Sequence, residues 1–150
     1  MDKDKNPGIK VGQVFLKRAE FDHAPGMLET SELRQANEHM IRINVSIALG
    51  ADDATKGLVL LSAETRPNNP GCYQFKVEMA GLFETETGAE NMTMADYLQG
   101  PAIAAMFPFL REAVANITGR GRFGSVWLKA LNIAAIKLDE VPATEADSAQ

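Results

Sequence analysis

The residues of this chain that could do chemistry are few, and the best spaced of them form a glycine-rich segment at 119–124 (GRGRFG). Its glycines have the spacing of a dinucleotide-binding fingerprint, which holds a pyrophosphate on backbone amides where a strand leads into a helix. Here the order is reversed, because the apolar pattern that precedes the glycines is helical. The segment therefore favours a helix C-terminus followed by a loop over a phosphate site.

The remaining titratable residues do not form a catalytic set. His23 could serve as a general base or a ligand, but no carboxylate and nucleophile accompany it, so we interpret it as a loop or solvent-facing residue. The paired acids Asp52-Asp53 and Glu84/Glu86 fall at turn signals, where carboxylates are usually solvated. One cysteine and two histidines lack the spacing of metal ligands. The sequence thus predicts no enzyme activity, no metal and no cofactor.

Two further positions carry side chains that suit binding. Arg111 and Glu112 are adjacent in a helical pattern, so they point about 100° apart and are expected to make two separate surface or interface ion pairs. Trp127, the single tryptophan, follows Phe123 in a segment after the glycines. A tryptophan in such a place is either a core residue or a contact for a ligand, and the sequence leaves both open.

The elements that must position these residues begin with a helix at 100–124. Its apolar residues recur at spacings of three and four, which puts them on one stripe: Ile103, Phe107, Leu110, Val114 and Ile117. Pro101 suits the first helical turn, and Gly119 and Gly121 suit the end, where a left-handed residue is favoured. Pro108 lies in the interior and costs about 3 kcal/mol, so it predicts a kink or a break.

The part of the chain before this helix reads as a sheet. Residues 41–49 and 73–85 alternate between apolar and polar, and 56–66 is apolar on both faces. Short links between them predict antiparallel neighbours, and 9–21 adds a fourth strand. We expect an α+β domain with a four-stranded, meander-like antiparallel sheet. The long connection at 22–37 is of a length that is usually functional or mobile.

Smaller features complete the expected organisation. Thr93 is expected to cap a short helix before Gly100, the stretch 125–131 is expected to be extended, and 132–138 is expected to form a short C-terminal helix. One domain covers 9–138, between a disordered arm at 1–8 and a disordered acidic tail at 139–150. The chain shows no internal repeat.

Composition restricts the class of protein. The chain has 150 residues, 45 % of them apolar, and a net charge of −5, which argues against a nucleic-acid or anionic-membrane partner. No apolar run is long enough to insert in a membrane, and the polar start does not resemble a secretory signal. The expected location is therefore the cytoplasm.

The chain has more apolar surface than one helix can cover. A sheet with an alternating face needs a cover, and a proline-broken helix is expected to supply only part of it, so the sequence predicts association. The expected oligomer interface combines the apolar face of one strand with the helix stripe: Tyr73, Phe75, Val77, Met79, Met106, Phe107 and Leu110.

Four stretches together resemble the SecB family of export chaperones. They are MFPFLRE at 106–112, ANIT at 115–118, RGRF at 120–123 and LNI at 131–133. The family has Phe-Pro, an aromatic residue and Arg-Glu within its long helix, then a helix end with Arg-Gly before Phe. A proline inside a helix is rarely tolerated, which makes this match specific.

The resemblance covers about 10–138 and implies a function without catalysis. Family members assemble as a homotetramer, a dimer of dimers, and hold unfolded preproteins in apolar grooves. The grooves are lined by the connection after the first strand and by the segment after the long helix. On this chain the implied client-binding residues are Met27, Leu28, Leu33, Phe123, Val126, Trp127, Leu128, Leu131, Ile133 and Ile136.

The chain also departs from the family pattern. The family docks the motor protein SecA through an exposed acid on the last strand, and the matching position here is Lys76, with Glu78 two residues on. This charge reversal weighs against SecA as a partner. SecB-like proteins also include chaperones dedicated to an antitoxin, and the sequence does not separate the two uses.

Two other classes of protein remain open. A small-ligand-binding protein or enzyme on a curved sheet would need convergent polar groups in an apolar pocket, and the sequence shows no such set. An adaptor oligomer would need its apolar surface to be fully consumed by a permanent interface.

Overall fold

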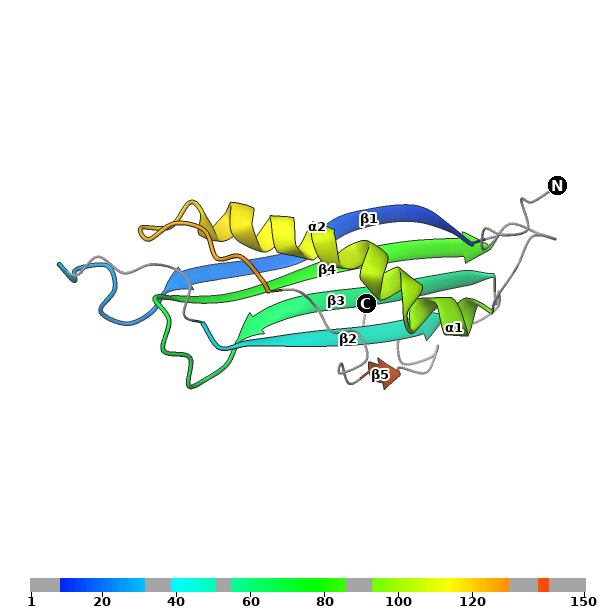
Figure 1. Ribbon diagram of the computed structural model, residues 1–150, viewed down its shortest axis with the longest axis horizontal. Coiled ribbons are helices and arrows are strands. Elements are labelled where there is room, and N and C mark those ends of the chain that lie inside the picture. The colour runs from blue at the N-terminus through cyan, green and yellow to red at the C-terminus, as the bar shows by residue number, and fades with distance from the viewer. Residues whose placement is uncertain (1–8, 32–38, 51–54, 86–92, 130–137, 141–150) are drawn as a thin grey trace.

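The computed structural model describes residues 9–31, 39–50, 55–85, 93–129 and 138–140. It shows one sheet with both helices on the same face, as Figure 1 displays. In chain order the elements are β1 (Ile9–His23), β2 (Ile41–Leu49), β3 (Lys56–Thr65), β4 (Tyr73–Thr85), α1 (Met94–Leu98), α2 (Pro101–Thr118) and β5 (Leu138–Glu140). The α+β class and the four long antiparallel strands agree with the prediction from the sequence.

The order of the strands is β1-β4-β3-β2-β5, which corrects the expected meander. β2, β3 and β4 are consecutive neighbours, because the short links between them leave no room for another arrangement. β1 lies beside β4 rather than β2, in a Greek-key arrangement. The long connection after β1 does not force the next strand to be a neighbour, so β1 pairs with the free edge of β4.

β5 is an unexpected fifth strand. Its three residues pair in parallel with β2, opposite Val45, Ser46 and Ile47. The acidic tail expected from Asp139 onward therefore does not begin there, since Asp139 and Glu140 belong to the sheet. The expected C-terminal helix at 132–138 lies outside the described residues, except for Leu138, which is in β5.

α2 continues through Pro108 without interruption, so of the two expected outcomes the helix has a bend and no break there. Pro108 lies on the exposed side of α2, where water can replace the hydrogen bond that a proline removes. The division between the helices falls at Gln99 and Gly100 instead. As predicted, Thr93 caps α1, its hydroxyl accepting a hydrogen bond from Asp96 N at 3.1 Å.

The glycines after α2 divide their roles differently from the prediction. Gly119 ends the helix with a φ of −63°, in the ordinary right-handed region. The left-handed residue is Gly124, with a φ of +88°. Gly121 has a different role: the backbone passes close to Tyr73 there, and a Cβ at this position would lie 2.7 Å from the Tyr73 ring.

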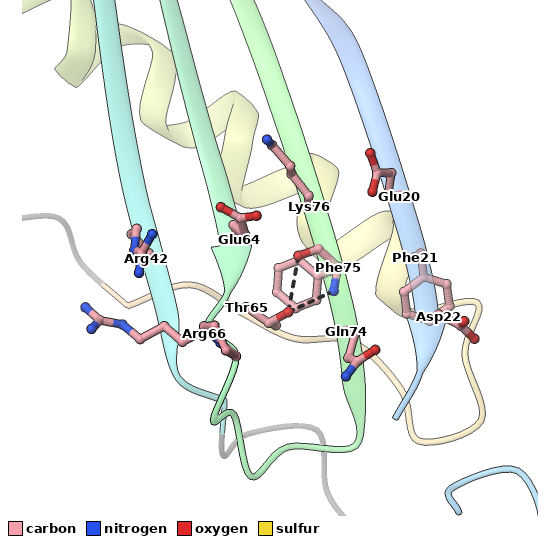
Figure 2. Close-up of a pocket in the computed structure, with 11 residues that line it drawn as sticks. Glu20, Phe21, Asp22, Arg42, Glu64, Thr65, Arg66, Gln74, Phe75 and Lys76 are labelled. Carbon is pink, nitrogen blue, oxygen red and sulfur yellow. Dashed lines mark hydrogen bonds between the residues drawn. The ribbon is translucent and has the colours of Figure 1, made fainter. Parts of the chain in front are cut away.

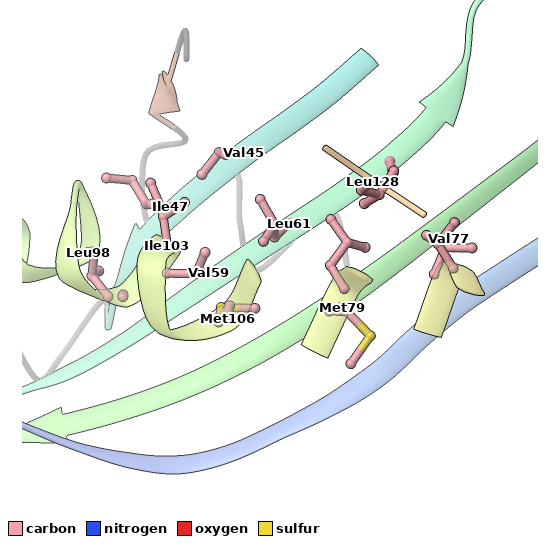
Figure 3. Close-up of a cluster of buried hydrophobic side chains, with 14 of the residues drawn as sticks. Val45, Ile47, Val59, Leu61, Val77, Met79, Leu98, Ile103, Met106 and Leu128 are labelled. Carbon is pink, nitrogen blue, oxygen red and sulfur yellow. The ribbon is translucent and has the colours of Figure 1, made fainter. Parts of the chain in front are cut away.

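The core lies between α2 and the inner face of the sheet (Figure 3). Ile103, Met106, Leu110 and Val114 form the buried stripe of α2, while Phe107 is only half-buried. The predicted stripe is confirmed at Ile103, Leu110 and Val114, whereas Phe107 and Ile117 are only half-buried and Met106 is fully buried. Gly81 on β4 makes room for Met106, since a Cβ there would lie 2.6 Å from its sulfur.

This core overturns most of the expected oligomer interface. Six of those seven residues are buried within the single chain: Tyr73, Phe75, Val77, Met79, Met106 and Leu110. The prediction underestimated how much of the sheet one helix covers, because α2 remains unbroken and contacts β1, β3 and β4. Only Phe107 keeps a surface for association.

The outer face of the sheet is contacted by neither helix among the described residues. The register sets its side chains in rows across the strands, one of which is Glu20, Lys76, Glu64 and Arg42. Phe15 and Leu82 lie on the same face and are 38 % and 41 % exposed. The outer face is thus polar at one end and partly apolar at the other.

Candidate functional site

The candidate site begins in the segment that follows α2. Residues 124–129 turn back beneath the helix in an extended conformation (Figure 1). Side chains of an extended segment alternate, so Val126 and Leu128 point into the core and Trp127 points out. Val126 and Leu128 are 3 % and 4 % exposed, while Trp127 is 59 % exposed.

Two side chains of α2 hold this segment in place. The buried hydroxyl of Thr118 donates to Val114 O at 2.6 Å and accepts from Val126 N at 2.8 Å. Arg111 Nε donates to Leu128 O at 2.9 Å. The Arg111 guanidinium also lies over the Trp127 ring, 5.1 Å from its centroid. The residues before and after Trp127 are thus both bonded to α2, which fixes the direction of the exposed tryptophan side chain.

The turn at 119–124 is fastened to β4 through one buried phenol. Tyr73 Oη donates to Gly124 O and accepts from Phe123 N, both at 2.8 Å. Burial raises the pKa of Tyr73 above its ordinary value of 10.0, and the hydrogen bond from Phe123 N opposes this. The phenol stays protonated at neutral pH, so it can both donate and accept.

Arg122 joins the turn to the connection after β1. Its Nη1 donates to Met27 O at 3.1 Å and to Leu28 O at 3.3 Å, and its backbone N donates to His23 Nε2 at 3.0 Å. The two segments that the sequence singled out are thus held side by side. His23 is an acceptor that orders this junction, which replaces the interpretation of a loop histidine facing solvent.

His39 supports the same cluster from the other side. Its ring stacks on Tyr73 with centroids 5.7 Å apart, and its Nε2 accepts from Tyr73 N at 3.2 Å. Its Nδ1 is buried and has no hydrogen-bond partner among the residues that the structure describes. Burial lowers the pKa of His39 below its ordinary value of 6.5. A neutral imidazole is required, because a protonated Nε2 could not accept the hydrogen bond.

Of the ten expected client-binding residues, four keep surface that is open to solvent. Leu28 is 68 % exposed and Trp127 59 %, while Met27 and Phe123 are half-buried against the core. Val126 and Leu128 are corrections, because alternation turns them inward. Leu33, Leu131, Ile133 and Ile136 lie outside the described residues.

Sequence reasoning missed the residues that hold the site together. The sequence places Tyr73 in the expected interface, Thr118 only in the family-like stretch ANIT, and Arg122 only in the glycine-rich segment. The partners of Tyr73 and Arg122 are far away in the chain, 51 residues in the case of Tyr73 and Gly124 and 95 in the case of Arg122 and Met27. The partners of Thr118 are only four and eight residues away, but its bond to Val126 forms only because the chain turns back after α2. Arg111 was expected to form an ion pair, but among the described residues its partner is the carbonyl of Leu128.

A depression of about 530 Å³ lies on the outer face of the sheet, away from these segments (Figure 2). Charged side chains from four strands line it, including Glu20, Arg42, Glu64 and Lys76, together with Thr65. The hydroxyl of Thr65 is occupied, because it donates to Phe75 O and accepts from Phe75 N. Lys76, the charge reversal noted in the sequence, lies between two glutamates of neighbouring strands.

The described residues hold no group of three histidine, cysteine or acidic side chains that could bind a metal. Of the paired acids, Glu84 is exposed on β4, and Asp52, Asp53 and Glu86 lie outside the described residues. Within the same part of the chain, no helix is long and apolar enough to cross a membrane.

The arrangement defines the class of protein by its fold: an antiparallel sheet with one long helix on one face, and two segments, held to it by hydrogen bonds, that carry exposed apolar side chains. Comparison with known proteins then gives the family. The model of the family described as preprotein translocase subunit SecB matches residues 2–142, and the chain belongs to the SecB family.

Individual relatives agree with this assignment. The chain is 22 % identical over 144 residues to the protein-export protein SecB of Haemophilus ducreyi, covering 95 % of this chain and 83 % of that one. It is 24 % identical over 134 residues to the SecB of Cellvibrio japonicus, covering 87 % and 77 %. In fold it is similar to a SecB-like chaperone of Mycobacterium tuberculosis, solved with a peptide from an antitoxin. That match has a TM-score of 0.62, 17 % identity and coverage of 83 % of this chain and 88 % of that one.

Proposed function

We propose that this protein is a holdase chaperone, which binds unfolded polypeptides and has neither enzyme activity nor a cofactor. The observation that carries the proposal is the exposure of Leu28 and Trp127 on two segments that Arg122 and Arg111 hold to the fold. Ordinary loops avoid that much apolar surface. Membership of the SecB family supports a chaperone role.

The physical basis is preferential binding of the unfolded state. An unfolded client exposes apolar side chains that a folded one buries, so a surface that recognises apolar groups lowers the free energy of the unfolded client alone. Met27 adds a flexible thioether beside the rigid aromatic rings of Phe123 and Trp127. Such a combination adapts to many sequences because it imposes no fixed polar pattern.

The clients are either preproteins or an antitoxin. The export-protein relatives favour the first, and the Mycobacterium tuberculosis chaperone with its antitoxin peptide favours the second. SecA is the weaker candidate as a partner, because Lys76 interrupts the acids of the outer face. Purifying the protein from its source with bound polypeptides intact, and identifying them, distinguishes the two client classes.

We further propose a cytoplasmic homotetramer whose single folded domain corresponds to the family match. Because most of the expected interface residues form the core of one chain, the association surface must lie elsewhere. The outer side of α2, with half-buried Phe107 and with Phe109 at 52 % exposed, is one part of it. Sedimentation at micromolar concentration tests this, and a clean monomer would contradict it.

Aggregation suppression tests the proposed function itself. A reduced, unfolding client is mixed with the protein, and light scattering is followed over time. We expect scattering to fall as the chaperone concentration rises. The Trp127→Ala variant should suppress aggregation less effectively at the same concentration. If neither protein alters scattering or binds an unfolded peptide, the adaptor or small-ligand class would be favoured instead.

A further inference from the structure

The chain has two histidines, and both pack against the same ring, that of Tyr73. The His23 ring meets it edge-on, with centroids 5.3 Å apart, and the His39 ring stacks on it at 5.7 Å. His23 ends β1 and His39 comes shortly before β2, so the two reach Tyr73 from different parts of the chain. The connection after β1 and the turn after α2 lie at this same end of the molecule (Figure 1). The phenol that fastens the turn is therefore bordered by both imidazoles.

Each histidine accepts a hydrogen bond from a backbone N–H at this junction. His23 Nε2 accepts from Arg122 N at 3.0 Å, and His39 Nε2 accepts from Tyr73 N at 3.2 Å. A ring nitrogen that accepts carries no proton, so each ring is neutral, with its proton on Nδ1. An imidazolium has an N–H at both positions, and protonation would therefore set one N–H against another at each contact.

The charged groups that face His23 come from its own strand and from the turn. Asp22 Oδ1 accepts from the backbone N of His23 at 2.7 Å, so this carboxylate is engaged away from the ring. The Arg122 guanidinium lies over Phe123, whose ring also contacts His23, and this positive charge opposes a second one nearby. Among the residues that the structure describes, no carboxylate forms an ion pair with the His23 imidazole. Protonation of His23 would thus break the hydrogen bond from Arg122 N without forming an ion pair.

The groups that surround His39 are uncharged. Its ring contacts those of Tyr73 and Phe75 and leaves no room for a side chain at Gly71. The Tyr73 phenol and the buried Cys72 thiol, the titratable groups beside it on β4 and just before it, carry no charge in acid. No carboxylate of the described segments forms an ion pair with this ring either. A proton on His39 would therefore place an uncompensated charge in a half-buried site, and burial lowers its pKa below 6.5 for this reason.

From these contacts we infer that the two histidines form a pH-sensitive latch on the candidate site: their protonation releases the turn at 119–124 from β4 and from the connection after β1. The inference rests on the proposed function and adds a form of regulation to its site. Release would not unfold the domain, because hydrogen bonds to α2 hold residues 126–128 without either histidine. Met27, Leu28 and Phe123 would lose their fixed arrangement, and a client would have to order them again, which lowers its affinity.

The test compares client binding at about pH 7.5 and about pH 5.5, on either side of the ordinary pKa of histidine. The probe is an unstructured peptide of leucine, phenylalanine, valine, glutamine and serine, with blocked ends and a dye that does not titrate in this range. Its own charge is then the same at both pH values. Fluorescence anisotropy measures its affinity for the full chain, and we expect binding to be about three- to tenfold weaker at the lower pH. Far-UV circular dichroism should not change, because the sheet and α2 remain folded.

Glutamine substitutions assign the effect to the histidines. The amide oxygen of glutamine can accept the same hydrogen bond but does not titrate. His23→Gln and His39→Gln should therefore each keep binding at the higher pH and reduce its dependence on pH, and the double variant should bind equally at both. Asp22→Asn is the matched control, because it removes the carboxylate next to His23 and keeps an acceptor for His23 N. This control should keep most of the pH dependence.

Nuclear magnetic resonance follows the latch directly in the unaltered chain. The ring protons of His23 and His39 report protonation, and the amide protons of Arg122 and Tyr73 report the two hydrogen bonds that should be lost. We expect each amide signal to shift with the same midpoint as the ring that accepts from it. Amides that do not follow the rings would overturn the inference, and this measurement decides the matter if a glutamine variant does not fold.

The possible outcomes separate this inference from the proposed function. If the peptide binds equally well at both pH values, the chaperone proposal stands and the latch is wrong. A double variant that loses affinity in acid as the native chain does would also overturn it, because groups other than the histidines would be responsible. If no peptide binds at the higher pH, the proposed function fails and the effect of the latch on clients fails with it.

Discussion

The hydroxyl of Thr118, the last residue of α2, accepts a hydrogen bond from the backbone N–H of Val126 at 2.8 Å. The same hydroxyl donates to Val114 O, so one buried side chain closes the helix and orients the segment that carries Trp127. This relationship makes the site part of the folded domain rather than a separate loop. Stability and client binding can therefore be tested separately by substitutions at neighbouring positions.

Thr118→Val should destabilise the protein by about 1–3 kcal/mol. The substitution keeps the shape but leaves the buried N–H of Val126 without its acceptor. Urea unfolding followed by circular dichroism measures the change. Thr118→Ser is the control, because it keeps the hydroxyl, and it should be markedly more stable than the valine variant. Equal stability of the two variants would show that the hydrogen bond is not what matters.

Trp127→Ala and Leu128→Ala should have opposite effects, although the residues are adjacent. Trp127 is exposed, so its loss should weaken client binding by about 1–3 kcal/mol and leave stability and oligomer mass nearly unchanged. Leu128 is buried, so its loss should lower the free energy of unfolding by about 2–5 kcal/mol. Client affinity, urea unfolding and sedimentation are measured on both variants. Unfolding or dissociation of Trp127→Ala, with normal client binding by the folded fraction, would make Trp127 a structural residue.

Tyr73→Phe should loosen the turn at 119–124 without disturbing the core. The ring remains, but Phe123 N and Gly124 O lose their shared partner. We expect a loss of about 1–2 kcal/mol in stability. Hydrogen exchange should become faster at Phe123 N and remain unchanged in the middle of β4. Unaltered exchange at Phe123 would mean that the turn does not depend on this hydroxyl.

His39 should make stability depend on pH in the acidic range. Its pKa is lowered in the folded chain, so the unfolded chain binds more protons just below the ordinary value of 6.5. The stability that neutral His39 contributes is therefore fully present above pH 6.5. It is lost as the pH falls from 6.5 through the lower pKa of His39 in the folded chain. His39→Gln, whose side-chain oxygen can still accept a hydrogen bond, should lose less stability than the native chain between about pH 7.5 and about pH 5.5. Equal losses in the two proteins would exclude His39 as the source.

Nucleotides and divalent metals should not change the melting temperature beyond ordinary salt effects. The glycines at 119–124 follow a helix instead of preceding one. A Cβ at Gly121 would meet Tyr73, so the Tyr73 ring occupies the space beside the turn where a phosphate would have to lie. A ligand that binds the folded state would raise the melting temperature with its concentration. A saturable shift with ATP or NAD would revive the phosphate-site reading of these residues.

Several features of the fold could be predicted from the sequence because their causes are local. The alternation at 41–49 and 73–85 fixes which strand face is buried, and the three-four spacing of α2 fixes its stripe. Thr93 could be recognised as a cap, because the hydroxyl and the amide that it accepts from are three residues apart. The glycines at 119–124 follow a helical pattern instead of leading into a helix, and this local order argued against a phosphate site.

The placement of β1 and the burial of residues 73–79 depended on the tertiary structure. A strand with two free edges to choose from carries no local signal for which it joins, and β1 pairs with β4. Whether an apolar face is covered by its own chain or by a copy depends on the path of α2, which Pro108 bends and does not break. The apolar pattern is the same in both cases.

For the candidate site, the sequence determined which segments are apolar, and the tertiary structure decided which side chains face solvent. Val126, Trp127 and Leu128 are equally apolar in the sequence, but Thr118 and Arg111 hold 126 and 128 toward the helix and leave 127 outside. The position of Arg111 over the Trp127 ring is likewise a product of folding, because a cation is attracted to a ring only when both are brought within about 6 Å. Hydrophobicity is a property of each residue, whereas exposure and charge pairing are properties of its neighbours in space.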